Sequence, residues 1–273
     1  MARRQVASRP APRATCHSLR PVDDDLALAL DLADLADAMT LPRFRALDLV
    51  VETKPDLTPV TEVDRGVERA IRGRLADLRP ADAVVGEELG AEEGGDGRWI
   101  VDPIDGTKNF VRGIPAYATL IAVERDGDLR VGVASAPALG RRWWASRGGG
   151  AFADGREITV SRIDRLEDAQ LGYSNWTAWE EAGMLDRFLD LGLRCWRTRG
   201  FGDFWQHVLV AEGASEISAE PSLALWDIAA VKLIVEEAGG RFTDFEGDRT
   251  LAAGPAVATN GLLHEEVLRA LRG

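Results

Sequence analysis

The sequence predicts a layered α+β fold, in which helices pack on sheets whose strands are not all parallel. Helix-like and strand-like segments follow one another in irregular order, and several neighbouring strands are joined by short hairpin turns, which pair strands antiparallel. No repeat or long low-complexity linker follows residue 20. A chain of 273 residues is long enough for one large domain or for two closely packed lobes.

The first 78 residues predict two helices with a strand between them. Apolar residues recur at helical spacing from residue 22 to 39, whereas Asp31, Asp34 and Asp37 keep to the other face. Residues 47–52 predict a strand. A second helix follows Thr61, and its apolar stripe consists of Val63, Val67, Ala70, Ile71, Leu75 and Leu78.

The rest of the chain predicts further strands and then more helices. Residues 83–85 and 99–101 are apolar runs that end on acids. Residues 118–124 and 129–134 flank the hairpin signal Arg125-Asp126-Gly127-Asp128, and residues 142–146 and 157–160 flank three consecutive glycines. The second half predicts a strand over 216–219 and helices over 178–190, 204–212 and 227–238, the last ended by Gly239-Gly240.

Composition limits the classes of function. The net charge is −12, and the first twenty residues carry five Arg and no acid, so the remaining 253 residues carry −17. An acidic body repels a phosphate backbone, so we expect no nucleic-acid partner, and no apolar run is long enough to span a membrane. The chain has only two cysteines, which argues against disulfides and thiolate metal sites and favours the cytoplasm.

The segment around Asp102 and Asp105 carries the most chemical information. An apolar strand delivers Asp102, Pro103 interrupts the hydrogen-bond ladder, and Gly106-Thr107 opens a turn or a helix. Two carboxylates so placed can converge on Mg²⁺, which prefers oxygen ligands, and the N–H groups of Gly106 and Thr107 could receive phosphate oxygens. The alternative is a plain strand-to-helix connection with Asp as turn former.

Four further acids occupy suggestive positions. Glu87 and Glu88 follow an apolar strand directly, and of the two we expect Glu87 to be the metal ligand. Asp227 opens a helix, where capping that helix is the commoner role for an Asp. Asp64 stands three residues after Thr61, the spacing of a capping box, which is a purely structural role.

The order and spacing of four strings resemble the inositol-monophosphatase-like family of metal-dependent phosphatases. The strings are GEE, WIVDPIDGTKNF, GGGAFADG and LWDIAAVKLIVEEAGG, and the resemblance covers about residues 22–272. It implies an α-β-α-β-α sandwich, a homodimer and two or three Mg²⁺ ions. It further implies metal ligands at Glu87, Asp102, Asp105, Asp227 and the carbonyl of Ile104.

The resemblance also implies catalytic and substrate-binding roles. Thr107, paired with Asp64, would orient the attacking water, and Glu220, seven residues before Asp227, would bind the leaving group. The strings DGTKNFVRGIP and GDFWQHVLVAEG are similar to the histidinol-phosphatase branch. Histidinol phosphate has an ammonium and an imidazole, so Asp203 and Glu220 would neutralise a positive charge that inositol lacks; for Asp203 a helix N-cap is an equal alternative.

The expected organisation and function follow from these residues. Residues 1–20 would be a disordered basic tail, with a transit peptide left open. Residues 21–150 would form an α+β lobe with most metal ligands, and residues 151–273 an α/β lobe that completes the active site. We expect hydrolysis of a small phosphate monoester. The alternatives are a general inositol- or sugar-phosphate phosphatase and a non-catalytic interaction protein on the same fold.

Overall fold

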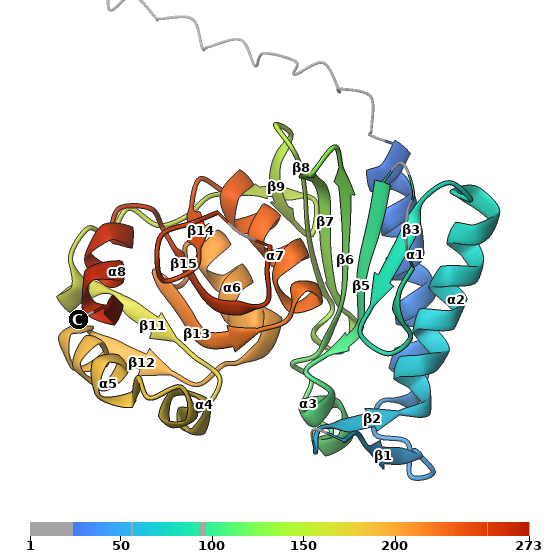
Figure 1. The fold of residues 1–273 in the computed structure, drawn as a ribbon, viewed down its shortest axis with the longest axis horizontal. Helices are drawn as coiled ribbons and strands as arrows, with labels where there is room; N and C mark the ends of the chain where they lie inside the picture. The colour runs from blue at the N-terminus through green and yellow to red at the C-terminus, as the bar shows by residue number, and fades with distance from the viewer. Residues whose placement is uncertain (1–23, 56, 93–94, 96, 250, 273) are drawn as a thin grey trace, which may run out of the picture.

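The computed structural model describes residues 24–55, 57–92, 95, 97–249 and 251–272; the predicted basic tail lies outside these residues. The described part forms five layers, which confirm the predicted layered α+β fold (Figure 1). Helices α1 (Asp24–Thr40) and α2 (Glu62–Leu78) cover one face of an eight-stranded sheet. Helices α6 (Asp203–Ala211) and α7 (Leu225–Glu237) lie between that sheet and a five-stranded one. The outer face of the second sheet is covered by α4 (Trp176–Glu181), α5 (Leu185–Arg194) and α8 (His264–Arg272).

The two larger sheets are both mixed. The eight-stranded sheet has the order β10-β9-β8-β7-β6-β5-β3-β4, and only its pair β3–β5 is parallel. Its strands are β3 (Ala83–Gly86), β4 (Gly90–Ala91), β5 (Gly97–Asp105), β6 (Ala118–Arg125), β7 (Asp128–Ala136), β8 (Arg141–Ser146), β9 (Gly150–Ala153) and β10 (Arg156–Ile158). The five-stranded sheet has the order β12 (Arg197–Arg199), β11 (Gln170–Gly172), β13 (Ile217–Leu223), β15 (Gly254–Thr259) and β14 (Arg241–Thr243). The chain therefore passes between these sheets after Ile158, and a lobe division at residue 150 stays a prediction.

Two of the predicted elements differ from the structure. The strand expected over 47–52 begins only at Val51, in the small hairpin of β1 (Val51–Thr53) and β2 (Pro59–Thr61), because the N–H of Val50 donates to the Glu62 side chain (2.8 Å). The helix expected over 178–190 is two helices, α4 and α5. Gly183 has a left-handed backbone (φ 69°), which ends the first helix.

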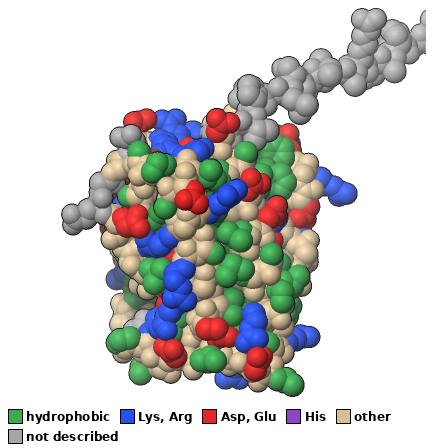
Figure 2. Space-filling model, turned by 90° about the vertical axis from the view of Figure 1, so that its right-hand side faces the viewer, with side chains coloured by type: hydrophobic (Ala, Val, Ile, Leu, Met, Phe, Trp, Pro, Cys, Tyr) green, Lys and Arg blue, Asp and Glu red, His purple; other side chains and the backbone are tan. Residues whose placement is uncertain are grey.

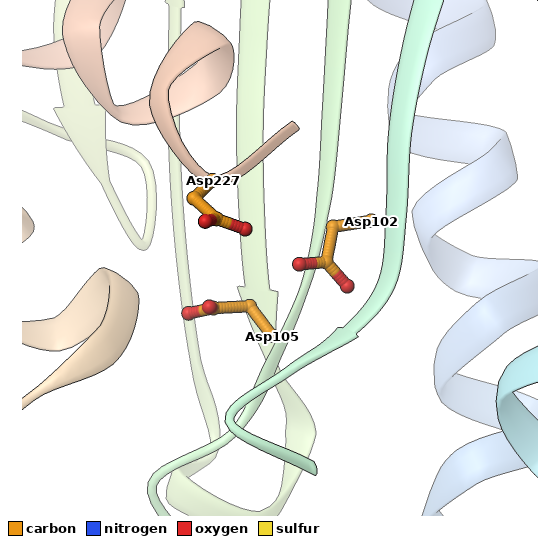
Figure 3. Close-up of side chains that lie close together, drawn as sticks. All are labelled: Asp102, Asp105 and Asp227. Atoms are coloured by element: carbon orange, nitrogen blue, oxygen red, sulfur yellow. The ribbon is translucent and has the colours of Figure 1, made fainter. Parts of the chain in front are cut away.

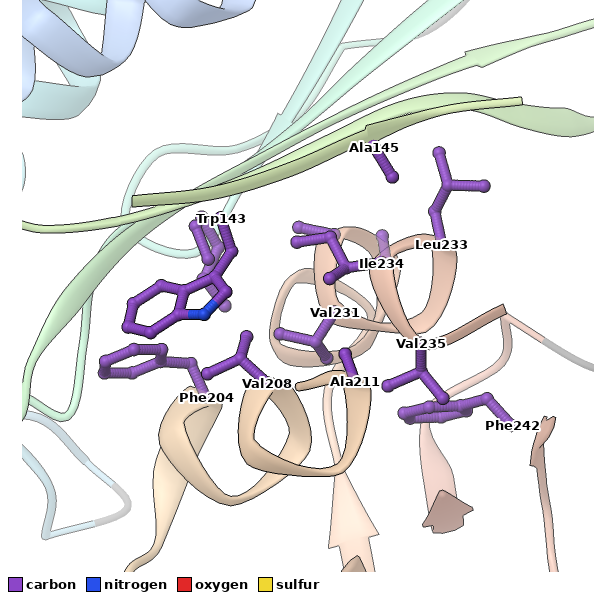
Figure 4. Packing of buried hydrophobic residues seen from close by; sticks show 14 of the residues in the cluster. Trp143, Ala145, Phe204, Val208, Ala211, Val231, Leu233, Ile234, Val235 and Phe242 are labelled. Carbon is purple, nitrogen blue, oxygen red and sulfur yellow. The ribbon is translucent and has the colours of Figure 1, made fainter. Parts of the chain in front are cut away.

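The core that positions the functional residues lies between the eight-stranded sheet and helices α6 and α7 (Figure 4). Trp143 of β8 packs against Phe204 of α6, with ring centroids 5.9 Å apart. A side chain on Gly132 of β7 would meet the carbonyl oxygen of Ala230 at 2.6 Å, so glycine is what lets α7 lie so close to the sheet. This close packing fixes where the first turn of α7 stands relative to the strands.

The outer side of the molecule carries mixed charge. The face in Figure 2 shows basic and acidic side chains interspersed, with single apolar side chains between them. Among the residues that the structure describes, no helix has both the length and the apolar character that crossing a bilayer requires.

Candidate metal-binding active site

Three carboxylates from two distant segments of the chain meet at one point; Asp102 and Asp105 are buried and Asp227 is half-buried. Asp102 and Asp105 come from the end of β5, and Asp227 comes from the first turn of α7 (Figure 3). One oxygen of each lies within 4.8 Å of the corresponding oxygen of the other two. Their side chains point toward one another, so the structure brings together three of the four carboxylates predicted as metal ligands.

Strand β5 presents two carboxylates because its ladder is interrupted. Asp102 pairs with Leu120 on β6, but the register shifts before Asp105 pairs with Ala118, since Pro103 has no N–H to donate. The N–H of Ile104 donates instead to Asp102 Oδ1 (2.9 Å). The predicted break at Pro103 is thus a bulge, after which the strand resumes.

The first turns of α6 and α7 complete the carboxylate cluster. Asp227 is the third residue of α7, and its Oδ2 accepts the N–H of Ala224, the N-cap, at 2.8 Å. The alternative role of Asp227 as N-cap is therefore wrong, because the N-cap is Ala224, three positions earlier. Asp105 Oδ2 accepts the N–H of Phe204 at the start of α6 (2.5 Å). Each carboxylate is oriented by a backbone N–H on one oxygen, which leaves the other available to a ligand.

The electrostatics of this cluster favour a bound cation. Burial raises the pKa of Asp102 well above its ordinary value, and the charges of Glu87, Asp105 and Asp227 raise it further. Burial also raises the pKa of Asp105 well above its ordinary value, and the charges of Asp203 and Asp227 raise it further. Burial raises the pKa of Asp227 to about 7. Clustered carboxylates repel one another, and an oxygen-rich donor set of this kind fits a hard divalent ion such as Mg²⁺.

A hydroxyl and a fourth buried carboxylate adjoin the cluster. Thr107 Oγ1 lies 3.2 Å from Asp64 Oδ1 and 2.9 Å from the carbonyl oxygen of Ile104, so it can donate to either. Asp64 Oδ2 accepts the N–H and the hydroxyl of Thr61 (2.8 and 2.5 Å), and the capping box on α2 is complete. The structural role predicted for Asp64 and its pairing with Thr107 therefore coexist.

Glu87 stands beside the cluster and is held by a lysine. Because β3 runs parallel to β5 and Gly86 pairs with Val101, Glu87 lies beside Asp102 at the same edge of the sheet. Lys54 Nζ lies 2.6 Å from Glu87 Oε1 and 2.5 Å from Glu88 Oε1. Burial opposes the charge of Lys54, but its hydrogen bonds to both glutamates raise its pKa. Metal binding by Glu87 remains a prediction.

Comparison with known proteins identifies the family. The model of the inositol monophosphatase family matches residues 23–273. The chain belongs to the inositol monophosphatase family. Histidinol-phosphatases of Streptomyces coelicolor and Mycobacterium tuberculosis are 54% and 55% identical to it, over 90% and 91% of this chain and 96% and 98% of theirs. The suhB protein structure from Bartonella henselae is 30% identical with a TM-score of 0.86, covering 92% of this chain and 99% of that one.

In this inositol monophosphatase family member, one predicted substrate acid, Asp203, lies next to the carboxylate cluster, and the other, Glu220, lies near Asp203. The charge of Asp203 raises the pKa of Asp105 and contributes to raising that of Glu220. Asp203 is not the N-cap of α6, which is Gly202; its Oδ2 instead accepts the side-chain amide of Asn109 (2.9 Å), and its backbone is left-handed (φ 52°). The N-cap alternative for Asp203 is therefore wrong, because its side chain points to α3 (Thr107–Arg112).

Three residues of the site were missed from the sequence. Asn109 Nδ2 bridges Asp203 and the carbonyl of Ala116 (2.8 Å), and Gln206 Nε2 donates to Glu220 Oε1 (2.5 Å). Neither has a sequence signal, because their partners are distant in the chain. Lys54 did have a sequence signal, because it is one of only three lysines among the 33 basic residues of the chain. Lysine differs from arginine in presenting a compact charge.

Without metal, this family member should lose stability as pH rises. The folded carboxyls keep protons that the unfolded chain releases, so the free energy of unfolding falls between about pH 4 and about pH 7. Thermal unfolding in EDTA across this range measures the fall, and saturating Mg²⁺ should remove it. Asp227→Asn, which removes one buried charge, should flatten the EDTA curve; an unchanged slope would contradict the electrostatic account.

Proposed function

We propose that this chain is a Mg²⁺-dependent phosphatase that hydrolyses histidinol phosphate to histidinol and phosphate. The observation that carries the proposal is a pair of further carboxylates, the half-buried Asp203 beside the cluster of Asp102, Asp105 and Asp227 and the buried Glu220 near Asp203. A cluster of three acids suits metal-assisted phosphate chemistry, and two further acids suit a substrate that carries positive charge. The names of the relatives from Streptomyces coelicolor and Mycobacterium tuberculosis support the same substrate.

The proposed metal ligands are the three clustered carboxylates, Glu87 and the carbonyl of Ile104. Two or three Mg²⁺ ions held there would polarise the phosphoryl group, lower the pKa of a water and stabilise the leaving oxygen. Occupation of the cluster would also relieve the mutual repulsion that raises the pKa values of its carboxyls. Glu87 would then exchange its contact with Lys54 for the metal.

Thr107 and Asp64 are proposed to orient the attacking water. The Thr107 hydroxyl has one proton and two acceptors within reach, Asp64 Oδ1 and the carbonyl of Ile104. When the hydroxyl donates to Asp64, its oxygen can accept a hydrogen bond from water. The hydroxyl can then take a proton from that water while it gives its own proton to the Asp64 carboxylate. Asp64 is held still by two hydrogen bonds from Thr61. The N–H groups of Gly106 and Thr107 at the start of α3 are proposed to bind phosphate oxygens.

Asp203 and Glu220 are proposed to select a cationic leaving group. Burial raises the pKa of Glu220 to about 7 and that of Asp203 to about 6. An ammonium or imidazolium placed beside them would lower both values, since it favours the charged carboxylate. The neutral hydroxyls of inositol offer no such gain. Ionic pairing in a buried site therefore favours histidinol phosphate over uncharged sugar phosphates.

A substrate panel tests the proposal. We expect kcat/KM for histidinol phosphate to exceed that for inositol 1-phosphate, fructose 1,6-bisphosphate and an adenosine bisphosphate by at least about tenfold, which equals about 1.4 kcal/mol of transition-state preference. Initial rates of phosphate release at saturating Mg²⁺ measure it. Tenfold preference for inositol phosphate would refute the substrate assignment.

Two variants separate substrate recognition from metal chemistry in the same panel. Asp203→Asn and Glu220→Gln should lower kcat/KM for histidinol phosphate more than they lower the small activity on inositol 1-phosphate. Equal losses on both substrates would place these residues in the general machinery instead. Absence of Mg²⁺-dependent phosphate release from every substrate would favour a non-catalytic interaction protein.

We also propose that the protein is a homodimer, as the family resemblance predicts. We propose that it works in the cytoplasm, as the scarcity of cysteine predicts.

A further inference from the structure

A buried glutamate outside the carboxylate cluster holds the turn that carries Glu87. Glu68 lies one helical turn after Asp64 on α2, and its side chain has no exposed surface. Its Oε2 accepts the N–H of Glu88 at 2.7 Å, and its Oε1 accepts the N–H of Leu89 at 3.2 Å. The carboxylate thus binds the backbone of the two residues that follow Glu87.

The Glu68 carboxylate is also bound by Arg72, which donates hydrogen bonds to the backbone near the same turn. Arg72 Nε lies 2.9 Å from Glu68 Oε1, one helical turn further along α2. The Arg72 guanidinium donates to the carbonyl oxygens of Gly90 and, at 3.4 Å, Val84. The buried Glu68 and the partly buried Arg72 therefore bind the turn after β3, and Arg72 also binds the backbone of β3 and β4, which holds this segment against α2.

The fit between Glu68 and the turn requires glycine at the end of β3. A Cβ at Gly86 would overlap the Glu68 carboxylate, so the backbone of Gly86 lies directly against the acid. Glycine at this position is explained by close approach and not by its backbone angles, because Gly86 is not among the glycines with positive φ. The residue before Glu87 and the residue after it are therefore both in contact with one buried side chain.

We propose that Glu68 is a positioning residue for the metal site, which it serves by fixing the turn of Glu87 through the backbone. The inference rests on the proposed metal ligands. Glu68 does not reach the reacting atoms. A residue that only orients a ligand changes metal affinity by about 10–100-fold when it is replaced. Glu68 therefore governs how tightly Mg²⁺ is held and has little influence on turnover once the metal is bound.

Calorimetric titration of the full-length protein with Mg²⁺ tests this role. Glu68→Gln should weaken Mg²⁺ binding about 10–100-fold, because its amide oxygen can accept only one of the two N–H groups of the turn and its N–H₂ group faces the other. Glu68→Asp keeps the charge opposite Arg72 but is too short to reach the turn, so it should show the same loss of Mg²⁺ affinity. This second variant tests the proposal if Glu68→Gln fails to fold. Both should recover most of the wild-type kcat at saturating Mg²⁺, with KM for the phosphate ester unchanged.

Glu92→Gln is the matched control. Glu92 is an exposed partner of Arg72 at 2.8 Å on the same turn, and its replacement should leave Mg²⁺ affinity within about twofold of wild type. Wild-type affinity in folded Glu68→Gln or Glu68→Asp, or an equal loss in the control, would overturn the inference while the proposed function stands. No Mg²⁺ binding by the wild-type protein would overturn both.

Discussion

Replacing Asp102 by Asn is expected to lower kcat at least about 10³-fold, equivalent to about 4 kcal/mol of transition-state stabilisation. Asp102 contributes one of the three converging oxygens, and its Oδ1 is already engaged by the N–H of Ile104. An amide has the same shape but no charge, so its oxygen is a much weaker ligand to a hard cation than a carboxylate is. Phosphate release at saturating Mg²⁺ measures the loss.

The fold of this variant should survive, because Asp102 is a source of repulsion in the metal-free protein. Its pKa is raised by burial and by the three acids around it, so removing its charge should stabilise the protein in EDTA at neutral pH. Asp31→Asn, an identical change at an exposed position on α1, is the control and should retain full activity. Near wild-type turnover of the Asp102 variant would refute the metal-site assignment.

Replacing Thr107 by Val is expected to lower kcat by about 10²–10⁴-fold with little change in KM. Valine keeps the shape of threonine but removes the hydroxyl that lies 3.2 Å from Asp64 Oδ1 and 2.9 Å from the carbonyl oxygen of Ile104. A water could still enter the site, but no group would orient it or pass its proton to the carboxylate. The kcat at saturating substrate and Mg²⁺ is the quantity to measure.

Thr119→Val is a closely matched control for this prediction. The Thr119 hydroxyl donates to the carbonyl of Pro103 at 2.8 Å, so its loss removes a buried hydrogen bond to the same segment without touching Asp64. Both variants should lose about 1–3 kcal/mol of stability, but only the Thr107 variant should lose turnover. If the two variants have equal kcat, Thr107 is structural.

The locally encoded features were predictable. Helix α2 follows from its apolar stripe and from the Thr61–Asp64 capping box, and β5 follows from an apolar run that ends at Asp102. The layered α+β class follows from the hairpins, and the family follows from motifs that span nearly the whole chain. Each of these signals lies within a few residues of the feature it predicts.

Features that depend on distant contacts were not predictable in this way. Asp203 has the sequence position of a helix cap, yet its side chain accepts from Asn109, 94 residues away. Nothing near Glu68 in the sequence shows that its carboxylate will receive the N–H of Glu88, 20 residues later. Lys54 contacts Glu87 and Glu88 only because the β1–β2 hairpin lies beside the end of β3.

The sequence by itself therefore predicted the carboxylates of the candidate metal site and the local element on which each stands. Only the tertiary structure decided that Asp102, Asp105 and Asp227 face one another within 4.8 Å. The parallel pairing of β3 with β5 puts Glu87 and Asp102 at one sheet edge, and Gly132 lets α7 approach closely enough to bring Asp227 there. Local patterns report the conformation of a segment, whereas convergence depends on how segments pack, which no single segment encodes.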